Sequence, residues 1–190
     1  MGTSTNQRSP ARPTWRLPQA LLGRPDVSPD IQGAEIWRAA SFDPETAVAR
    51  RLSDPILANA CAIAAKAVSP VEATRLYDSV LNETRTAGFI FDLARRALTR
   101  SVAKGSGVQG FAAELFAETV AYYASRDLPS YVGKYGRIST ASEVIEFKKK
   151  LQQHTRDVVS REPLPKLSKD NWSTFVYHIV DKLCAKATHG

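Results

Sequence analysis

Basic side chains gather at one end of an expected helix, where they could bind phosphate. Arg95, Arg96, Arg100 and Lys104 lie on that helix and at its exit. Arg96 and Arg100 are four residues apart, so they share one helix face. Asp92, four residues before Arg96, could instead hold this pair in an internal salt bridge. The two interpretations are equally good at this point.

A second basic group surrounds a tyrosine. Lys134 and Arg137 flank Tyr135, and Tyr131 lies just before them. Cations beside tyrosine can grip phosphates and stack bases in single-stranded nucleic acids. The candidate nucleic-acid-binding residues are therefore Arg95, Arg96, Arg100, Lys104, Lys134, Tyr135 and Arg137.

Two other segments have a weaker claim to phosphate. The lysine run 148–150 covers most of a helical turn, and a solvated helix face is the favoured interpretation. The Lys-Gly-Ser-Gly segment 104–107 precedes a helix and could bind phosphate through backbone N–H groups. It lacks the residue order of a Walker loop, so a flexible connection between two helices is favoured.

The sequence contains no pattern typical of catalysis or metal binding. Nucleophilic catalysis needs a nucleophile, a base and an orienting group, yet His154, His178 and His189 lie in no recognisable motif. Glu114 and Glu118 are four residues apart, but no histidine follows Glu114 by three residues, as in di-metal helix bundles. We therefore expect a protein that is not an enzyme and that has no cofactor, catalytic residue or metal site.

Residues 1–42 form an extended arm in this prediction. Prolines recur between positions 10 and 29 and prevent a long helix. The first 25 residues contain four arginines and no Asp or Glu. A purely solvated tail would not keep two tryptophans, so we expect the arm to dock on its own domain or on a neighbouring subunit. The candidate self-association contacts are Trp15, Leu21, Leu22 and Trp37.

Targeting signals, apolar runs and cysteines bear on where in the cell the protein is found. The arm has no apolar core of a secretory signal, and no apolar run reaches the roughly 18 residues of a membrane span. Arginine and serine without acids are also typical of organellar transit peptides, although the prolines argue against the amphipathic helix these need. Cys61 and Cys184 lie far apart in apolar patterns, which predicts free thiols in a reducing compartment such as the cytoplasm.

Residues 43–190 carry helix signals throughout. Polar cap residues followed by proline or by an acid or amide recur along this part, as at Asp54, Ser69, Ser106 and Thr140. Between residues 108 and 123 the apolar side chains recur every three or four positions, and strand signals are nearly absent. The sequence predicts an all-α domain of six or seven helices over 43–190, preceded by the Pro/Arg-rich arm.

Three segments form a pattern that is met elsewhere. They are the Ala-Ala-Lys-Ala-Val run 64–68 before a helix over 69–83, the helix 108–123, and the loop Pro129–Arg137. Together with the arm, they resemble the helical core of coat proteins from flexuous filamentous plant RNA viruses, of the potexvirus and potyvirus type. The resemblance covers about Ile63 to Phe147.

The resemblance implies RNA encapsidation by helical polymerisation, with RNA in a basic groove of each subunit and a location in the virion or the cytoplasm. The chain departs from the family at two places. The helix from Val108 lacks the arginine that the family buries there, and Glu146 stands where an aspartate is expected.

Two functions remain open from the sequence. The net charge of +7 favours polyanionic partners. It supports a nucleic-acid-binding assembly protein, a homo-oligomer that polymerises along single-stranded RNA as a coat or nucleocapsid protein does. The alternative is a helical adaptor or structural subunit of a larger complex, in which the arm is the protein contact and the charge is incidental.

Overall fold

The structure is a computed structural model and describes residues 48–127, 140–164 and 169–185. Within these ranges it contains seven helices and no strand, which confirms the all-α prediction. The predicted arm, with Trp15, Leu21, Leu22 and Trp37, lies outside the described residues. The helices are α2 (Val48–Leu52), α3 (Pro55–Ala64), α4 (Pro70–Thr84), α5 (Phe89–Ala103), α6 (Gly107–Asp127), α7 (Ala141–Arg161) and α8 (Lys169–Cys184).

Polar caps begin three of these helices, as their sequences predict. Thr140 accepts from the N–H of Glu143, whose carboxylate accepts from the Thr140 N–H, both at 3.3 Å. The hydroxyl of Ser69 accepts from the N–H of Glu72 at 3.2 Å, but the Glu72 carboxylate reaches the residue before the cap. Asp54 accepts from the N–H two residues on, at 2.9 Å. Each such cap stabilises its helix by roughly 1 kcal/mol.

The turn between α5 and α6 is built differently from the other helix starts. The hydroxyl of Ser106 donates to the carbonyl oxygen of Ser101 at 3.2 Å, at the end of α5. Gly105 and Gly107 both have left-handed backbone, with φ of 61° and 57°. Only glycine enters this region without steric cost, so the two glycines allow the tight reversal that lays α6 against α5.

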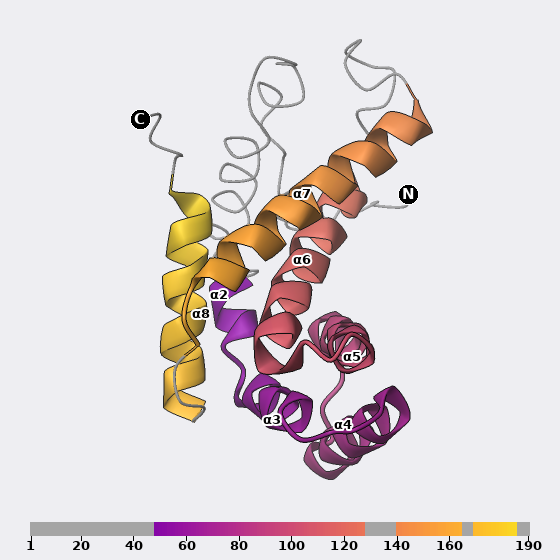
Figure 1. The fold of residues 1–190 in the computed structure, drawn as a ribbon, viewed down its shortest axis with the longest axis vertical. Helices are drawn as coiled ribbons and strands as arrows, with labels where there is room; N and C mark the ends of the chain where they lie inside the picture. Colours follow the sequence, from indigo (N-terminus) through magenta and orange to yellow (C-terminus); the bar gives the residue numbers. More distant parts are fainter. Residues whose placement is uncertain (1–47, 128–139, 165–168, 186–190) are drawn as a thin grey trace, which may run out of the picture.

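Helix α6 is the centre of the described fold. It packs against α3, α5 and α7, and Figure 1 shows α7 running along it while α3, α4 and α5 gather towards its start. Every residue from Phe111 to Ala121 is buried. A helix that is apolar almost all round must be surrounded by other elements, because water would otherwise face its side chains.

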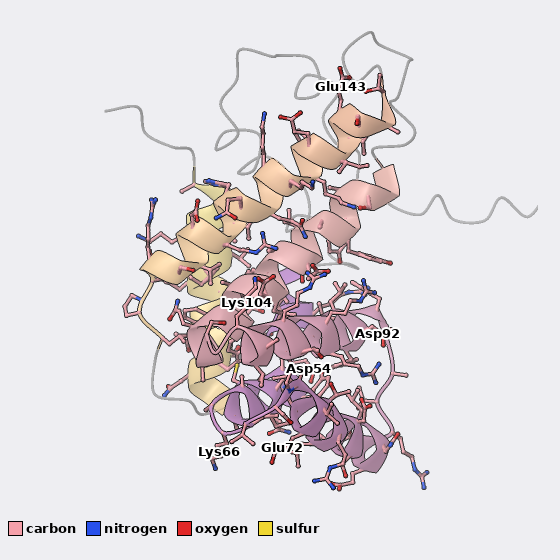
Figure 2. The ribbon with its side chains drawn as sticks, turned by 45° about the vertical axis from the view of Figure 1, so that its right-hand side comes forward. Asp54, Lys66, Glu72, Asp92, Lys104 and Glu143 are labelled. Atoms are coloured by element: carbon pink, nitrogen blue, oxygen red, sulfur yellow. The ribbon has the colours of Figure 1, made fainter. Side chains whose placement is uncertain are left out.

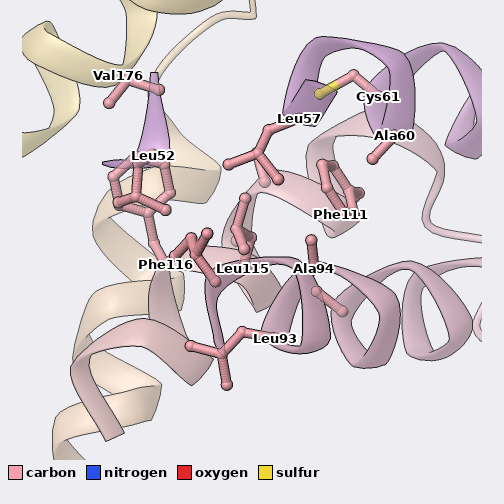
Figure 3. Packing of buried hydrophobic residues seen from close by; sticks show 14 of the residues in the cluster. Leu52, Leu57, Ala60, Cys61, Leu93, Ala94, Phe111, Leu115, Phe116 and Val176 are labelled. Carbon is pink, nitrogen blue, oxygen red and sulfur yellow. The ribbon is translucent and has the colours of Figure 1, made fainter. Parts of the chain in front are cut away.

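Helix α8 closes the core on the side of α2. Trp172 is fully buried and donates its indole N–H to the carbonyl oxygen of Leu52 at 2.8 Å. Its ring centroid lies 6.4 Å from that of Phe111 on α6. Leu57 and Leu115 also lie in this core, which Figure 3 shows from close by. Burying one such side chain contributes about 1.5–3 kcal/mol.

Cys61 and Cys184 form no disulfide with each other. Cys61 is fully buried, and this burial raises the pKa of its thiol far above the ordinary value. Cys184 is half-buried near the end of α8. In the described part of the chain, no helix combines the length and the apolar character needed to cross a membrane.

Candidate nucleic-acid interface

Arg95 is held between α4 and α5 by two aspartates. Its guanidinium donates through Nε to Asp78 at 2.7 Å and through Nη1 to Asp92 at 3.2 Å. Asp92 thus pairs with Arg95 and not with Arg96, the partner considered from the sequence. Arg96 has no carboxylate partner among the described residues. Because Arg95 already pairs with two carboxylates, it is a weak candidate for binding a phosphate.

Arg100 and Lys104 belong to an ion-pair network that joins α5, α6 and α7. Arg100 donates through Nη1 to Glu118 and also lies 3.9 Å from Glu114. Lys104 Nζ donates to Glu114 Oε1 at 2.7 Å. Arg156 on α7 donates to the other Glu114 oxygen at 3.1 Å. Figure 2 shows Lys104 and Asp92 at opposite ends of α5, so the two sets of ion pairs are separate.

The two carboxylates of this network are buried while their partners reach solvent. The side chain of Glu114 is 5% exposed and that of Arg100 is 47% exposed. Burial acts to raise the pKa of Glu114, but hydrogen bonds and charge from Lys104 and Arg156 outweigh it, so the pKa lies below its ordinary value. The carboxylate therefore stays ionised at neutral pH.

The sequence does contain a signal for this ion-pair network. The four-residue spacing of Glu114 and Glu118 relates them only to a metal-binding pattern, but their apolar surroundings predict buried ion pairs. Glu114 and Glu118 are the only acids between Phe111 and Ala121 of α6, where every other residue except Thr119 is apolar. Charges on such a helix must find buried partners, because an unpaired buried carboxylate is costly. Within the described ranges, no group of three His, Cys, Asp or Glu side chains could hold a metal ion.

A pocket of about 280 Å³ opens beside the network, between α5, α6 and α7. It brings together three cations, Arg96, Arg100 and Lys148, around one carboxylate, Glu118. Arg96 and Lys148 have no carboxylate partner among the described residues. The full lining is Leu93, Arg96, Arg100, Glu118, Ala121, Tyr122, Ser125, Lys148 and Gln152. We call this hollow the cationic pocket.

Neighbouring polar groups hold the charged ends of this pocket in place. Lys148 Nζ donates to the hydroxyl of Ser125 at 3.2 Å, which anchors the ammonium group of α7 against α6. Gln152 donates to Glu118 at 3.4 Å, on the oxygen that also accepts from Arg100. The charged ends of Lys148 and Arg100 are therefore partly ordered before any ligand arrives.

The lysine run 148–150 divides between the pocket and solvent. Lys149 is exposed, and Lys150 forms an exposed ion pair with Glu146 at 2.9 Å. Lys149 and Lys150 are therefore on a solvated helix face, as predicted. Lys148 is half-buried and lines the cationic pocket, so the prediction is wrong for this residue. Helix periodicity alone could not reveal that α5 and α6 approach this side of α7.

The predicted site residues thus fall into separate groups. Arg96 and Arg100 share the cationic pocket, as their i,i+4 spacing suggests. Lys104 lies in the adjoining network, and Arg95 is bound to the aspartates of α4 and α5. Lys134, Tyr135 and Arg137 lie outside the described residues. Two further residues line the pocket: Lys148, from the run for which a solvated face is favoured, and Tyr122, which the sequence does not mark as a candidate.

His178 on α8 pairs with a carboxylate at the end of α7. Its Nε2 lies 2.8 Å from the Glu162 carboxylate, and Lys182 Nζ lies 3.7 Å from the same group. The hydrogen bond from His178 is the main cause that keeps the pKa of Glu162 below its ordinary value. The contact joins the end of α7 to α8 and is about 50% exposed at the histidine.

Comparison with known proteins yields no relative. No family model matches the chain, and neither does any curated protein or solved structure. The resemblance to filamentous-virus coat proteins stays a prediction, and the site must be interpreted from its own geometry.

Proposed function

We propose that the protein binds single-stranded RNA, or another single-stranded nucleic acid, and that copies of it assemble along the strand without catalysing a reaction. The observation that carries this proposal is the cationic pocket. Helix α5 directs Arg96 and Arg100, and α7 directs Lys148, into one hollow, to which α6 contributes a single carboxylate, Glu118.

Charge in this pocket favours a phosphate over a neutral ligand. No carboxylate among the described residues pairs with Arg96 or Lys148, while Arg100 is shared with Glu118. A phosphodiester carries one negative charge, and its neutralisation by Lys and Arg releases counterions, which drives binding at low salt. Binding of this kind is expected to have little sequence preference and a strong salt dependence.

The ion pairs also reduce the number of predicted basic residues that are available to bind phosphate. Arg95 and Lys104 each have a carboxylate partner at 2.7 Å, so they contribute less to phosphate neutralisation than their positions in the sequence suggest. In the proposal, Arg96 and Lys148 provide the main phosphate contacts and Arg100 a secondary one. This assignment separates residues that the sequence alone groups together.

A second candidate function, a helical adaptor, is favoured by the surface around α4. Val68 and Val71 are 90% and 80% exposed at the start of this helix. Val71 also lines a hollow of about 640 Å³, together with other residues on one side of α4 and Thr99 of α5. Exposed apolar side chains beside a hollow are typical of protein contact sites.

A salt titration with matched variants tests the leading proposal. The pocket variant Arg96→Ala/Lys148→Ala removes two cations, and the control Lys66→Ala/Lys149→Ala removes two exposed cations that do not line the pocket. The probe is a mixed-sequence RNA single strand of about 16 nucleotides, near the upper site size of common single-strand binders. Fluorescence anisotropy gives Kd at several salt concentrations.

For the pocket variant, we expect weaker binding and a log–log salt slope that is flatter by about 0.7 for each phosphate that it no longer neutralises. The control should retain nearly the full slope. Equal weakening in both variants would mean that the basic charge acts without a site. No binding by the wild type at low salt would leave the adaptor function as the better account.

A further inference from the structure

Three side chains from three helices form a column beside the cationic pocket. The guanidinium carbon of Arg51 on α2 lies 5.1 Å from the ring centroid of Phe89, at the start of α5. Phe89 stacks on Tyr122 of α6, with centroids 4.4 Å apart and ring planes within 14°. Phe89 is half-buried, whereas Tyr122 is 38% exposed. The column therefore ends in a partly solvent-facing aromatic ring.

The ring of Tyr122 is held by aromatic neighbours. Tyr123 meets Tyr122 edge-on, with centroids 5.6 Å apart, and meets Phe89 edge-on at 6.0 Å. Tyr123 itself is buried. A ring fixed in this way loses little further rotamer entropy when a ligand stacks on it, so more of the contact energy remains for binding.

Tyr122 also lines the cationic pocket, together with Arg96 and Lys148. An aromatic surface and a phosphate-binding group are thus neighbours on one face. In a single strand each base is covalently joined to the adjacent phosphate through the sugar. A strand with a phosphate at Arg96 and Lys148 therefore brings a base towards Tyr122.

We propose that Tyr122 is a stacking site for a nucleobase, and that the ligand of this face is a single strand with unpaired bases. The inference rests on the proposed function, because the cationic pocket must hold the phosphate. A duplex has its bases stacked on one another and offers no free ring to Tyr122, and a polyanion without bases offers none at all. Stacking on Tyr122 would therefore favour a single strand over a duplex and over a polyanion without bases.

Two matched probes test the stacking site. One is a mixed-sequence DNA single strand of about 16 nucleotides, and the other is an abasic deoxyribose-phosphate strand of the same length and charge. Wild type, Tyr122→Leu and Tyr122→Phe are titrated with each. Leucine keeps an apolar cover on Phe89 without an aromatic face, and phenylalanine keeps the face without the hydroxyl.

We expect wild type to bind the base-bearing strand more tightly than the abasic strand. Tyr122→Leu should weaken binding of the base-bearing strand by about 5- to 150-fold, the range for one stacked base. It should leave abasic binding and the salt slope nearly unchanged, because stacking is not ionic. Tyr122→Phe should restore most of the affinity.

Equal affinity of wild type for the two strands overturns the stacking site and leaves the proposed function standing. So does an equal weakening for both strands in Tyr122→Leu, since that marks a packing role. If wild type binds neither strand, the stacking site is overturned, and if it also fails to bind the RNA strand of the salt titration, the proposed function fails with it. Should Tyr122→Leu not fold, the wild-type comparison and Tyr122→Phe still decide the question.

Discussion

Arg156 on α7 donates to Glu114 on α6 at 3.1 Å, although the two residues are 42 positions apart in the chain. Glu114 is 4% exposed and also accepts from Lys104. This interaction fixes α7 against α6 with charge as well as with apolar packing. It also places a buried carboxylate next to the cationic pocket, so the stability of the fold and the shape of the pocket depend on the same network.

Glu114→Ala is expected to lower the free energy of unfolding by about 1.5–3 kcal/mol, because Lys104 and Arg156 lose their hydrogen bonds to the buried carboxylate. Urea denaturation followed by circular dichroism measures the change. The matched control is Glu146→Ala, which removes an exposed ion pair with Lys150 and should cost no more than about 1 kcal/mol. Similar destabilisation in the two variants would show that burial of Glu114 does not matter.

Stability should also fall in acid through Glu114. The pKa of Glu114 is lower in the folded chain than its ordinary value of 4.5, so the unfolded chain binds more protons in acid. The stabilisation is fully present above about pH 4.5 and is lost as the pH falls towards the folded pKa. In denaturation measured from pH 7 to pH 3, Glu114→Gln should show a flatter dependence than wild type. Parallel curves would contradict this.

Arg95→Ala and Arg96→Ala separate a structural arginine from a ligand-binding one. Arg95 is bound to Asp78 and Asp92, so its removal should cost no more than about 1 kcal/mol of stability at this half-exposed site and should change RNA affinity little. Arg96→Ala should leave stability unchanged and flatten the salt slope by about 0.7. The reverse pattern in paired denaturation and anisotropy measurements would refute the proposed phosphate contacts.

The predicted arm is tested by its removal. Deletion of residues 1–42 should leave a folded helical domain, because the described helices already enclose a common core from Val48 onward. It should also lower the oligomeric state, if Trp15 and Trp37 contact a neighbouring copy. Sedimentation velocity reports the mass, and the far-ultraviolet circular dichroism spectrum reports the helices. An unchanged mass would argue against self-association through the arm.

Local patterns predict the helices well because their causes lie within a few residues. The caps at Ser69 and Thr140 act within one turn, and both hold in the structure. The periodic apolar residues of α6 are buried as their spacing predicts, but burial extends to every residue from Phe111 to Ala121 and not to one face alone. The ion pairs are harder to predict. Periodicity indicates which face of a helix is apolar, but not which other helix packs against it.

Lys148 illustrates this limit at the candidate site. Its sequence neighbours Lys149 and Lys150 are exposed, and nothing in the run marks Lys148 as different. Only the packing of α7 on α6 brings its ammonium group to Ser125 and into the cationic pocket. Tyr122 likewise belongs neither to the apolar stripe nor to the predicted binding residues, because its role depends on Phe89 from another helix.

The complete burial of the centre of α6 has a consequence for how the protein opens. Leu115 and Phe116 can reach water only if α5 or α7 moves away, because both of these helices pack against α6. The amide hydrogens from Phe111 to Ala121 should therefore exchange with deuterium only when the whole domain unfolds. Their exchange rates would report the global stability of the domain, while the amides of the exposed start of α4 exchange earlier through local fraying.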